Sequence, residues 1–203
     1  MSTSTDVKAN HLLATGKTAK LLASSLAVAG LLQFACAPAQ ATVAASAELK
    51  AGTLGWVTTP TELKFPATTL NGLLQSISQT EALDVGDATG SGAGWNITAT
   101  STTFTNGPHT LATSATKIGS APTVACDAGA TGCVTATTTG LVSYPYSLPA
   151  GASAPTATRM FNAAANTGMG NQTVSAKWEL EVPPSTFAGT YTSTWTLSLI
   201  SAP

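Results

Sequence analysis

Hydrophobic and polar residues alternate with a period of two in many short runs after residue 47. Clear runs lie at 54–57, 73–77, 95–103, 134–139 and 141–148. This alternation predicts strands that bury one face. Turn signals separate the runs, at Asn71-Gly72, Asn106-Gly107-Pro108, Pro149-Ala150-Gly151 and Gly168-Met169-Gly170-Asn171. Because helical periodicity is not sustained past the first forty residues, we expect an all-β protein, an Ig-like or Greek-key antiparallel β-sandwich.

The clearest alternation lies near the C-terminus, in the runs AKWELEV and YTSTWTLSL. Trp178 and Leu180 share the apolar face of the first run, and Trp195 and Leu197 share that of the second. If the two strands pair as a hairpin, the indoles lie opposite each other in one sheet. If the connection crosses between sheets, the indoles meet across the core. The pattern leaves both arrangements open, and it favours core packing for both rings.

The first forty residues have a different pattern. Three lysines precede an apolar stretch at 21–37, and Ala39-Gln40-Ala41 follows. This order predicts a helical signal peptide over 1–41, removed after Ala41. A retained membrane anchor is less favoured, and so is lipidation of Cys36, because its preceding residues make a poor lipobox. We therefore expect a secreted chain without a membrane span after cleavage.

Charged residues make up only 8% of the chain, and the net charge is −1. Eight basic residues are too few for the positive stripe that nucleic acid requires. The apolar content of 43% argues against disorder. Thr and Ser fill the polar positions instead, and β-branched Thr suits the wet face of a strand.

Two cysteines, Cys126 and Cys133, remain after the expected cleavage. Outside the cytoplasm, an isolated pair so close in sequence predicts a disulfide. A metal site would require further ligands, and His109 is the only histidine after the leader. We therefore predict neither a metal nor a cofactor.

A glycine-rich stretch at 84–96 contains the next candidates. Asp84, Asp87, Trp95 and Asn96 are predicted as possible loop contacts to a ligand, although core packing is the favoured interpretation for Trp95. The two aspartates also suggest calcium, with backbone oxygens completing the site. That reading is not favoured, because few acidic neighbours are visible and Asp is common in turns.

The sequence gives little indication of a catalytic site. Glu179 and Glu181 lie two residues apart on one strand face, a spacing that suits paired glycosidase carboxylates. Nothing around them indicates a sugar cleft. His109 has no neighbouring Asp or nucleophilic Ser motif, and the G-x-S-x-G elbow does not occur. We predict a protein that is not an enzyme.

Two Trp-x-Leu motifs, Trp178-Glu179-Leu180 and Trp195-Thr196-Leu197, make the chain resemble the WxL family of Gram-positive surface proteins, its actinobacterial branch in particular. Tyr191 precedes the distal motif as in the family. The glycine-rich segment and Phe104-Thr105-Asn106-Gly107 also resemble it. Lys177 departs from the pattern, which more often has Thr there.

The resemblance covers residues 53–203 and implies a secreted β-sandwich domain at the cell surface, preceded by a short segment at 42–52. It also implies non-covalent attachment to the cell wall, with peptidoglycan as the ligand. A membrane-anchored protein partner within a multi-protein surface complex is implied as well.

A structural subunit of a surface fibre or coat, similar to pilin and spore-coat-U β-sandwiches, is the alternative. Such a polymer requires a free N-terminal donor strand. Residues 42–52 are mostly small and only partly alternating, which favours the wall-binding reading.

Overall fold

The structure is a computed structural model that describes residues 40–138 and 140–201. Contacts divide the chain into two units, Met1–Ser46 and Ala47–Pro203, and every strand of the described residues lies in the second unit. The predicted signal peptide, Cys36 included, lies outside the described residues except for its last two positions.

The larger of two main sheets is built around the longest strands. Its path runs β1 (Leu54–Thr58), β2 (Gln75–Asp87), β11 (Gly170–Val182), β6 (Thr116–Ile118) and β8 (Tyr146–Ser147), and β7 (Thr123–Cys126) also pairs with β11. All of these pairs are antiparallel, and β2 and β11 are joined along their full lengths.

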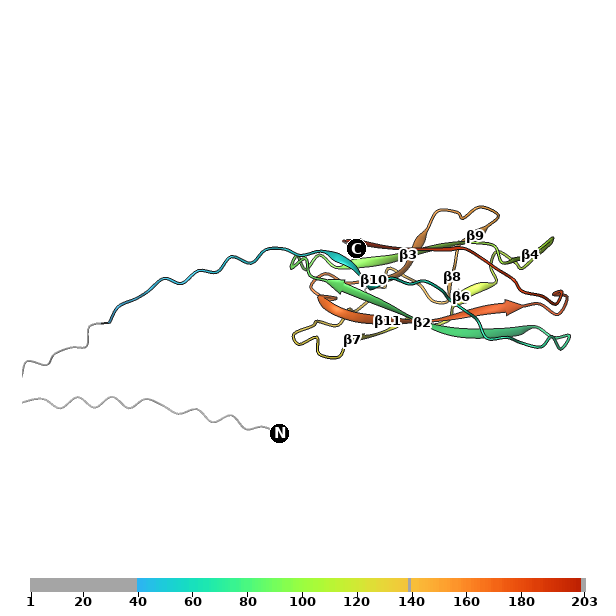
Figure 1. The fold of residues 1–203 in the computed structure, drawn as a ribbon, viewed down its shortest axis with the longest axis horizontal. Coiled ribbons are helices and arrows are strands. Elements are labelled where there is room, and N and C mark those ends of the chain that lie inside the picture. The colour runs from blue at the N-terminus through green and yellow to red at the C-terminus, as the bar shows by residue number, and fades with distance from the viewer. Residues whose placement is uncertain (1–39, 139, 202–203) are drawn as a thin grey trace, which may run out of the picture. The chain divides into compact units, whose positions relative to one another are not determined.

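The smaller sheet has the order β10 (Thr158–Ala163), β3 (Trp95–Thr102) and β12 (Trp195–Ser201). β9 (Ala150–Gly151) pairs with β3 in parallel, and β4 (Thr105–Asn106) and β5 (His109–Thr110) form a separate hairpin. The two main sheets form two layers (Figure 1), and the core fills the space between them. The described residues contain no helix, so the all-β prediction is confirmed, and the fold is consistent with a β-sandwich.

Several of the observed strands differ from the predicted ones in length or position. The runs at 54–57 and 95–103 become β1 and β3, whereas the run at 73–77 is only the entry to β2. The run at 141–148 was wrong as one strand, because only Tyr146–Ser147 pairs there. Pro145 and Pro149 cannot donate to a ladder, which explains the short pairing.

The run at 134–139 was also wrong, since its described residues contain only a bridge at Val134. Ala136 is buried there without a strand partner. Its N–H donates to Oε1 of the buried Gln172, at 2.8 Å. A side chain thus replaces the ladder bond that the alternation led us to expect.

The two Trp-x-Leu runs lie in different sheets. In β11, Ala176, Trp178, Leu180 and Val182 are all buried, as the alternation predicts. Residues 183–194 then carry the chain across to β12 in the smaller sheet. The crossing arrangement, one of the two left open, is therefore the one adopted, and the Trp178 and Trp195 ring centroids lie 4.8 Å apart at 76°.

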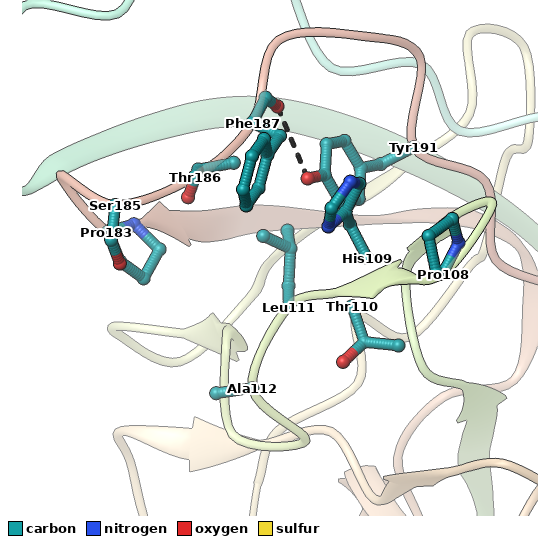
Figure 2. Close-up of a pocket in the computed structure, with 10 residues that line it drawn as sticks. All are labelled: Pro108, His109, Thr110, Leu111, Ala112, Pro183, Ser185, Thr186, Phe187 and Tyr191. Atoms are coloured by element: carbon teal, nitrogen blue, oxygen red, sulfur yellow. Dashed lines mark hydrogen bonds between the residues drawn. The ribbon is translucent and has the colours of Figure 1, made fainter.

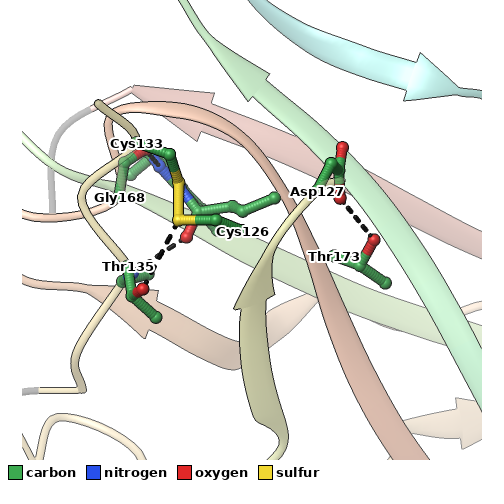
Figure 3. Close-up of a disulfide and its surroundings, with 9 residues drawn as sticks. Cys126, Asp127, Cys133, Thr135, Gly168 and Thr173 are labelled. Atoms are coloured by element: carbon green, nitrogen blue, oxygen red, sulfur yellow. Dashed lines mark hydrogen bonds between the residues drawn. A yellow bond between two sulfur atoms is a disulfide. The ribbon is translucent and has the colours of Figure 1, made fainter. Parts of the chain in front are cut away.

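Cys126 and Cys133 form the predicted disulfide, with Cα atoms 6.0 Å apart (Figure 3). It links the end of β7 to the loop that runs alongside Gly168 and Met169. Backbone bonds from Val134 N to Met169 O and from Gly168 N to Val134 O hold that loop in place.

Candidate functional site

The four predicted loop contacts do not lie on a loop. Asp84 and Asp87 belong to β2, and Trp95 and Asn96 begin β3. Asp87, Trp95 and Asn96 are buried, with exposed fractions of 5%, 0% and 4%. The connection between β2 and β3 occupies only residues 88–94, and the strands extend to either side of it, so all four residues lie in strands and Trp95 is packed in the core.

The two aspartates also point in different directions. Three residues apart on one strand, their side chains lie on opposite faces. Asp84 accepts a hydrogen bond from Thr58 Oγ1 at 2.9 Å, and Asp87 accepts two from Thr89, through its N–H and its Oγ1. The Asp84 carboxylate therefore joins β1 to β2, and the Asp87 carboxylate accepts bonds from the connection that follows β2. Among the described residues, no three His, Cys, Asp or Glu side chains gather as metal ligands.

The Trp-x-Leu residues belong to the core and its margin. Trp178 is 1% exposed and Leu180 5%, whereas Trp195 and Leu197 are half-buried. Trp178 packs edge-on against Tyr146 as well as Trp195. The Trp178 ring is therefore a core side chain and presents almost no surface to solvent.

Glu179 and Glu181 lie beside a lysine of the neighbouring strand. Lys117 of β6 pairs with Glu181, and this hydrogen bond and charge raise the Lys117 pKa. The carboxyl of Glu179 adds a smaller electrostatic contribution in the same direction. Glu181 thus forms a solvated ion pair with Lys117, and neither glutamate lines the two depressions described below.

A hollow of about 250 Å³ lies where the β4–β5 hairpin meets the 183–194 connection (Figure 2). Its walls carry hydroxyl and aromatic side chains and no carboxylate or lysine. The lining residues are Pro108, His109, Thr110, Leu111, Ala112, Pro183, Ser185, Thr186, Phe187 and Tyr191.

Local sequence signals build this hollow. Gly107 (φ 58°) and Pro108 form the two-residue turn between β4 and β5, as predicted from Asn106-Gly107-Pro108. The hairpin is joined to the connection by paired backbone bonds between Thr105 and Thr192, at 2.9 and 3.0 Å. Gly189 (φ 149°) passes so close that an added Cβ would overlap the side chain of Asn106.

Phe187 is the most accessible aromatic ring at the hollow, with 60% of its surface exposed. It stacks on His109, with ring centroids 3.8 Å apart and 16° between the planes. Tyr191 fixes the loop by donating from its hydroxyl to Phe187 O at 3.2 Å (Figure 2). The site therefore offers an exposed ring, stacked on His109, beside hydroxyl groups.

Sequence reasoning missed Phe187 and His109 as a pair, because they are 78 positions apart and the hairpin alone brings them together. One signal was available in the sequence. Phe187 follows Pro183-Pro184 and lies outside any alternating run, so no strand face accounts for its large apolar ring.

A larger groove, with a volume of about 1330 Å³, adjoins the hollow. It runs between the segment at 59–70 on one side and the residues leading into β12 on the other. Trp178 and Leu180 form part of its floor. Phe187 and Tyr191 line both depressions.

Comparison of the chain with protein-family models, with curated proteins and with solved structures finds no match. Within residues 40–138 and 140–201, no helix is long and apolar enough to cross a membrane.

Proposed function

We propose that the chain is a secreted protein of the bacterial cell surface that attaches non-covalently to peptidoglycan through a WxL-type domain at 53–203. The observation that carries this proposal is the exposed Phe187 ring, stacked on His109 beside the hydroxyl-lined hollow. In this reading the domain has Ig-like or Greek-key topology, and the mature chain begins after Ala41.

The chemistry of the hollow suits a sugar. An aromatic face packs against the C–H face of a sugar ring, and hydroxyl side chains exchange hydrogen bonds with its hydroxyl groups. Thr110, Ser185 and Thr186 supply such groups within the hollow. A chain with only 8% charged residues must bind chiefly through these neutral contacts.

In this proposal the Trp-x-Leu motifs position the loop that carries Phe187. The connection that carries Phe187 begins just after Trp178-Glu179-Leu180 and ends at Trp195. Because the two indoles contact each other across the core, both ends of the connection are held at a defined separation. The motifs then act through the placement of the loop, without touching glycan.

We further propose that the protein has no enzymatic activity and works beside a membrane-anchored partner in a surface complex. The ion pair of Lys117 with Glu181 supports the first statement, because it engages one of the two glutamates considered for glycoside hydrolysis. The WxL resemblance is the support for the partner.

Co-sedimentation with purified Gram-positive sacculi tests wall attachment. We expect residues 42–203 to pellet saturably and soluble peptidoglycan fragments to compete. Phe187→Ala should weaken pelleting about tenfold or more, because it removes the stacking surface. Its matched control is Leu141→Ala, which removes an apolar side chain of similar exposure, 58%, outside the hollow. A folded chain that does not pellet, or equal losses in both variants, would contradict the proposal.

A further inference from the structure

The smaller sheet ends at β12, and the outer edge of this strand has no hydrogen-bonded partner strand, although β1 of the larger sheet lies close to it. β12 pairs only with β3, and Trp195 lies opposite Ser101. One position earlier, Thr102 N donates to Thr194 O at 2.8 Å and Thr194 N donates to Thr102 Oγ1 at 2.8 Å, so Thr194 and Thr102 occupy a hydrogen-bonded position of the ladder. In an antiparallel ladder such pairs alternate. The N–H and C=O groups of alternate β12 residues therefore point away from β3.

Those outward-facing main-chain groups belong to Trp195, Leu197 and Leu199, and no backbone bond of the described residues reaches them. The side chains of the same residues point toward the core and are only half-buried. Trp195 and Leu197 line the large groove. The edge thus offers both a hydrogen-bonding template and an apolar surface that its own sheet does not cover.

The far wall of the groove is a strap, residues 59–70. Leu63 and Phe65 of this strap pack toward the core, and Phe65 contacts Phe104 edge-on. Within the described chain, no backbone hydrogen bond joins residues 60–70 to a strand. The strap covers the core with side chains alone and leaves the edge of β12 unpaired.

The same chain carries a segment without secondary structure whose sequence pattern suits this edge. Residues 43–51 alternate between Val, Ala, Ala, Leu and Ala on one face and Ala, Ser, Glu and Lys on the other. All of them are exposed, Val43 to 88% and Leu49 to 93%. Nine extended residues span about 30 Å, enough to cover the seven of β12, about 23 Å.

Small side chains suit this groove, because Leu63 and Phe65 already occupy part of it. The direction of the chain favours a second copy as the donor. Gly52 N donates to Ala88 O at 2.9 Å, so residues before 52 leave from the start of β1. The groove lies at the other end of β1, where Trp56 and Thr59 line it.

We propose that residues 43–51 of one copy add a strand to the edge of β12 in a second copy, placing Val43, Ala45, Ala47 and Leu49 in the groove. Main-chain bonds to Trp195, Leu197 and Leu199 supply the affinity, as in other strand additions. This association is independent of wall binding, and it gives the N-terminal segment a donor role that its sequence alone did not favour.

Size measurement tests the proposal on residues 42–203, which contain every strand, both hydrophobic clusters and the disulfide. The mean mass of the wild type should rise with concentration. Val43→Asp/Leu49→Asp should stay monomeric, because it places carboxylates on the donated apolar face. The control Ala44→Asp/Ser46→Asp adds the same charge to the opposite face and should associate like the wild type.

A labelled peptide, TVAASAELKAG, tests the acceptor directly against the Val43→Asp/Leu49→Asp chain. We expect saturable binding, and at least about tenfold weaker binding by a peptide that carries the same two substitutions. Hydrogen exchange should slow at the amides of Trp195, Leu197 and Leu199 when peptide binds. The proposal would be overturned if the wild type stayed monomeric and the peptide did not bind. Equal association of all variants, or protection away from β12, would do the same.

Discussion

The two ends of β3 are closed in different ways. At its start, Trp95 is fully buried against Phe161, and its Nε1 donates to Gly168 O at 2.9 Å. At its other end, Ser101 faces Trp195, which is only half-buried beside the groove. Trp95 and Trp195 are each the first residue of a strand. Trp95 is nevertheless fully buried, whereas Trp195 borders a groove.

Backbone proximity accounts for the difference. Gly168 lies so close to Trp95 that an added Cβ would lie 2.6 Å from Nε1, and Gly94 leaves no room beside Ala163 O. The disulfide loop runs along Gly168 and adds to this cover. At the other end, the strap and the 183–194 connection lie over the core and border the groove. One end is thus closed by tight backbone contacts, whereas the other borders an open groove.

The largest effect that the comparison predicts is at the closed end. Trp95→Ala should lower the free energy of unfolding by about 3–5 kcal/mol, because it leaves a cavity and an unpaired Gly168 carbonyl. Denaturant unfolding with the disulfide intact measures this. Trp95→Phe retains part of the packing and should lose less. A loss below about 1 kcal/mol for Trp95→Ala would show that this end is not close-packed.

Trp195→Ala should have a smaller effect, a loss of about 2 kcal/mol, because half-burial removes less apolar surface from water. The same unfolding experiment compares it with Thr196→Ala, an exposed neighbour on the other face, which should change stability by less than about 0.5 kcal/mol. If Trp195→Ala costs as much as Trp95→Ala, the two ends are equally sealed and the comparison fails.

The smallest effect is confined to alkaline pH. Burial raises the pKa of Tyr144 to about 12, and its hydroxyl donates to Met160 O at 2.7 Å. The unfolded chain releases this proton near pH 10. The stability that Tyr144 contributes is therefore complete below pH 10 and is lost as the pH rises toward 12. Tyr144→Phe should flatten that decline in a series of unfolding curves, and an unchanged decline would assign it to other groups.

Much of the fold was predictable because alternation reports local geometry. Ala176, Trp178, Leu180 and Val182 are buried as their spacing predicts, and the disulfide follows from an isolated pair of cysteines. The candidate site was predictable only in part. Asp87, Trp95 and Asn96 were considered as ligand contacts because a glycine-rich stretch lies between them, whereas in the structure β2 pairs with β11 as far as Asp87 and β3 begins at Trp95.

The sequence by itself determined the β class, the inner faces of the motif strands and the cysteine pair, because each depends on residues close together in the chain. Only the tertiary structure decided that the motif strands lie in different sheets, that Phe187 stacks on His109, and that one edge of β12 stays open. Those features depend on which distant segments come together. Alternation with a period of two shows which face of a strand is buried, but it does not show which strand is its partner.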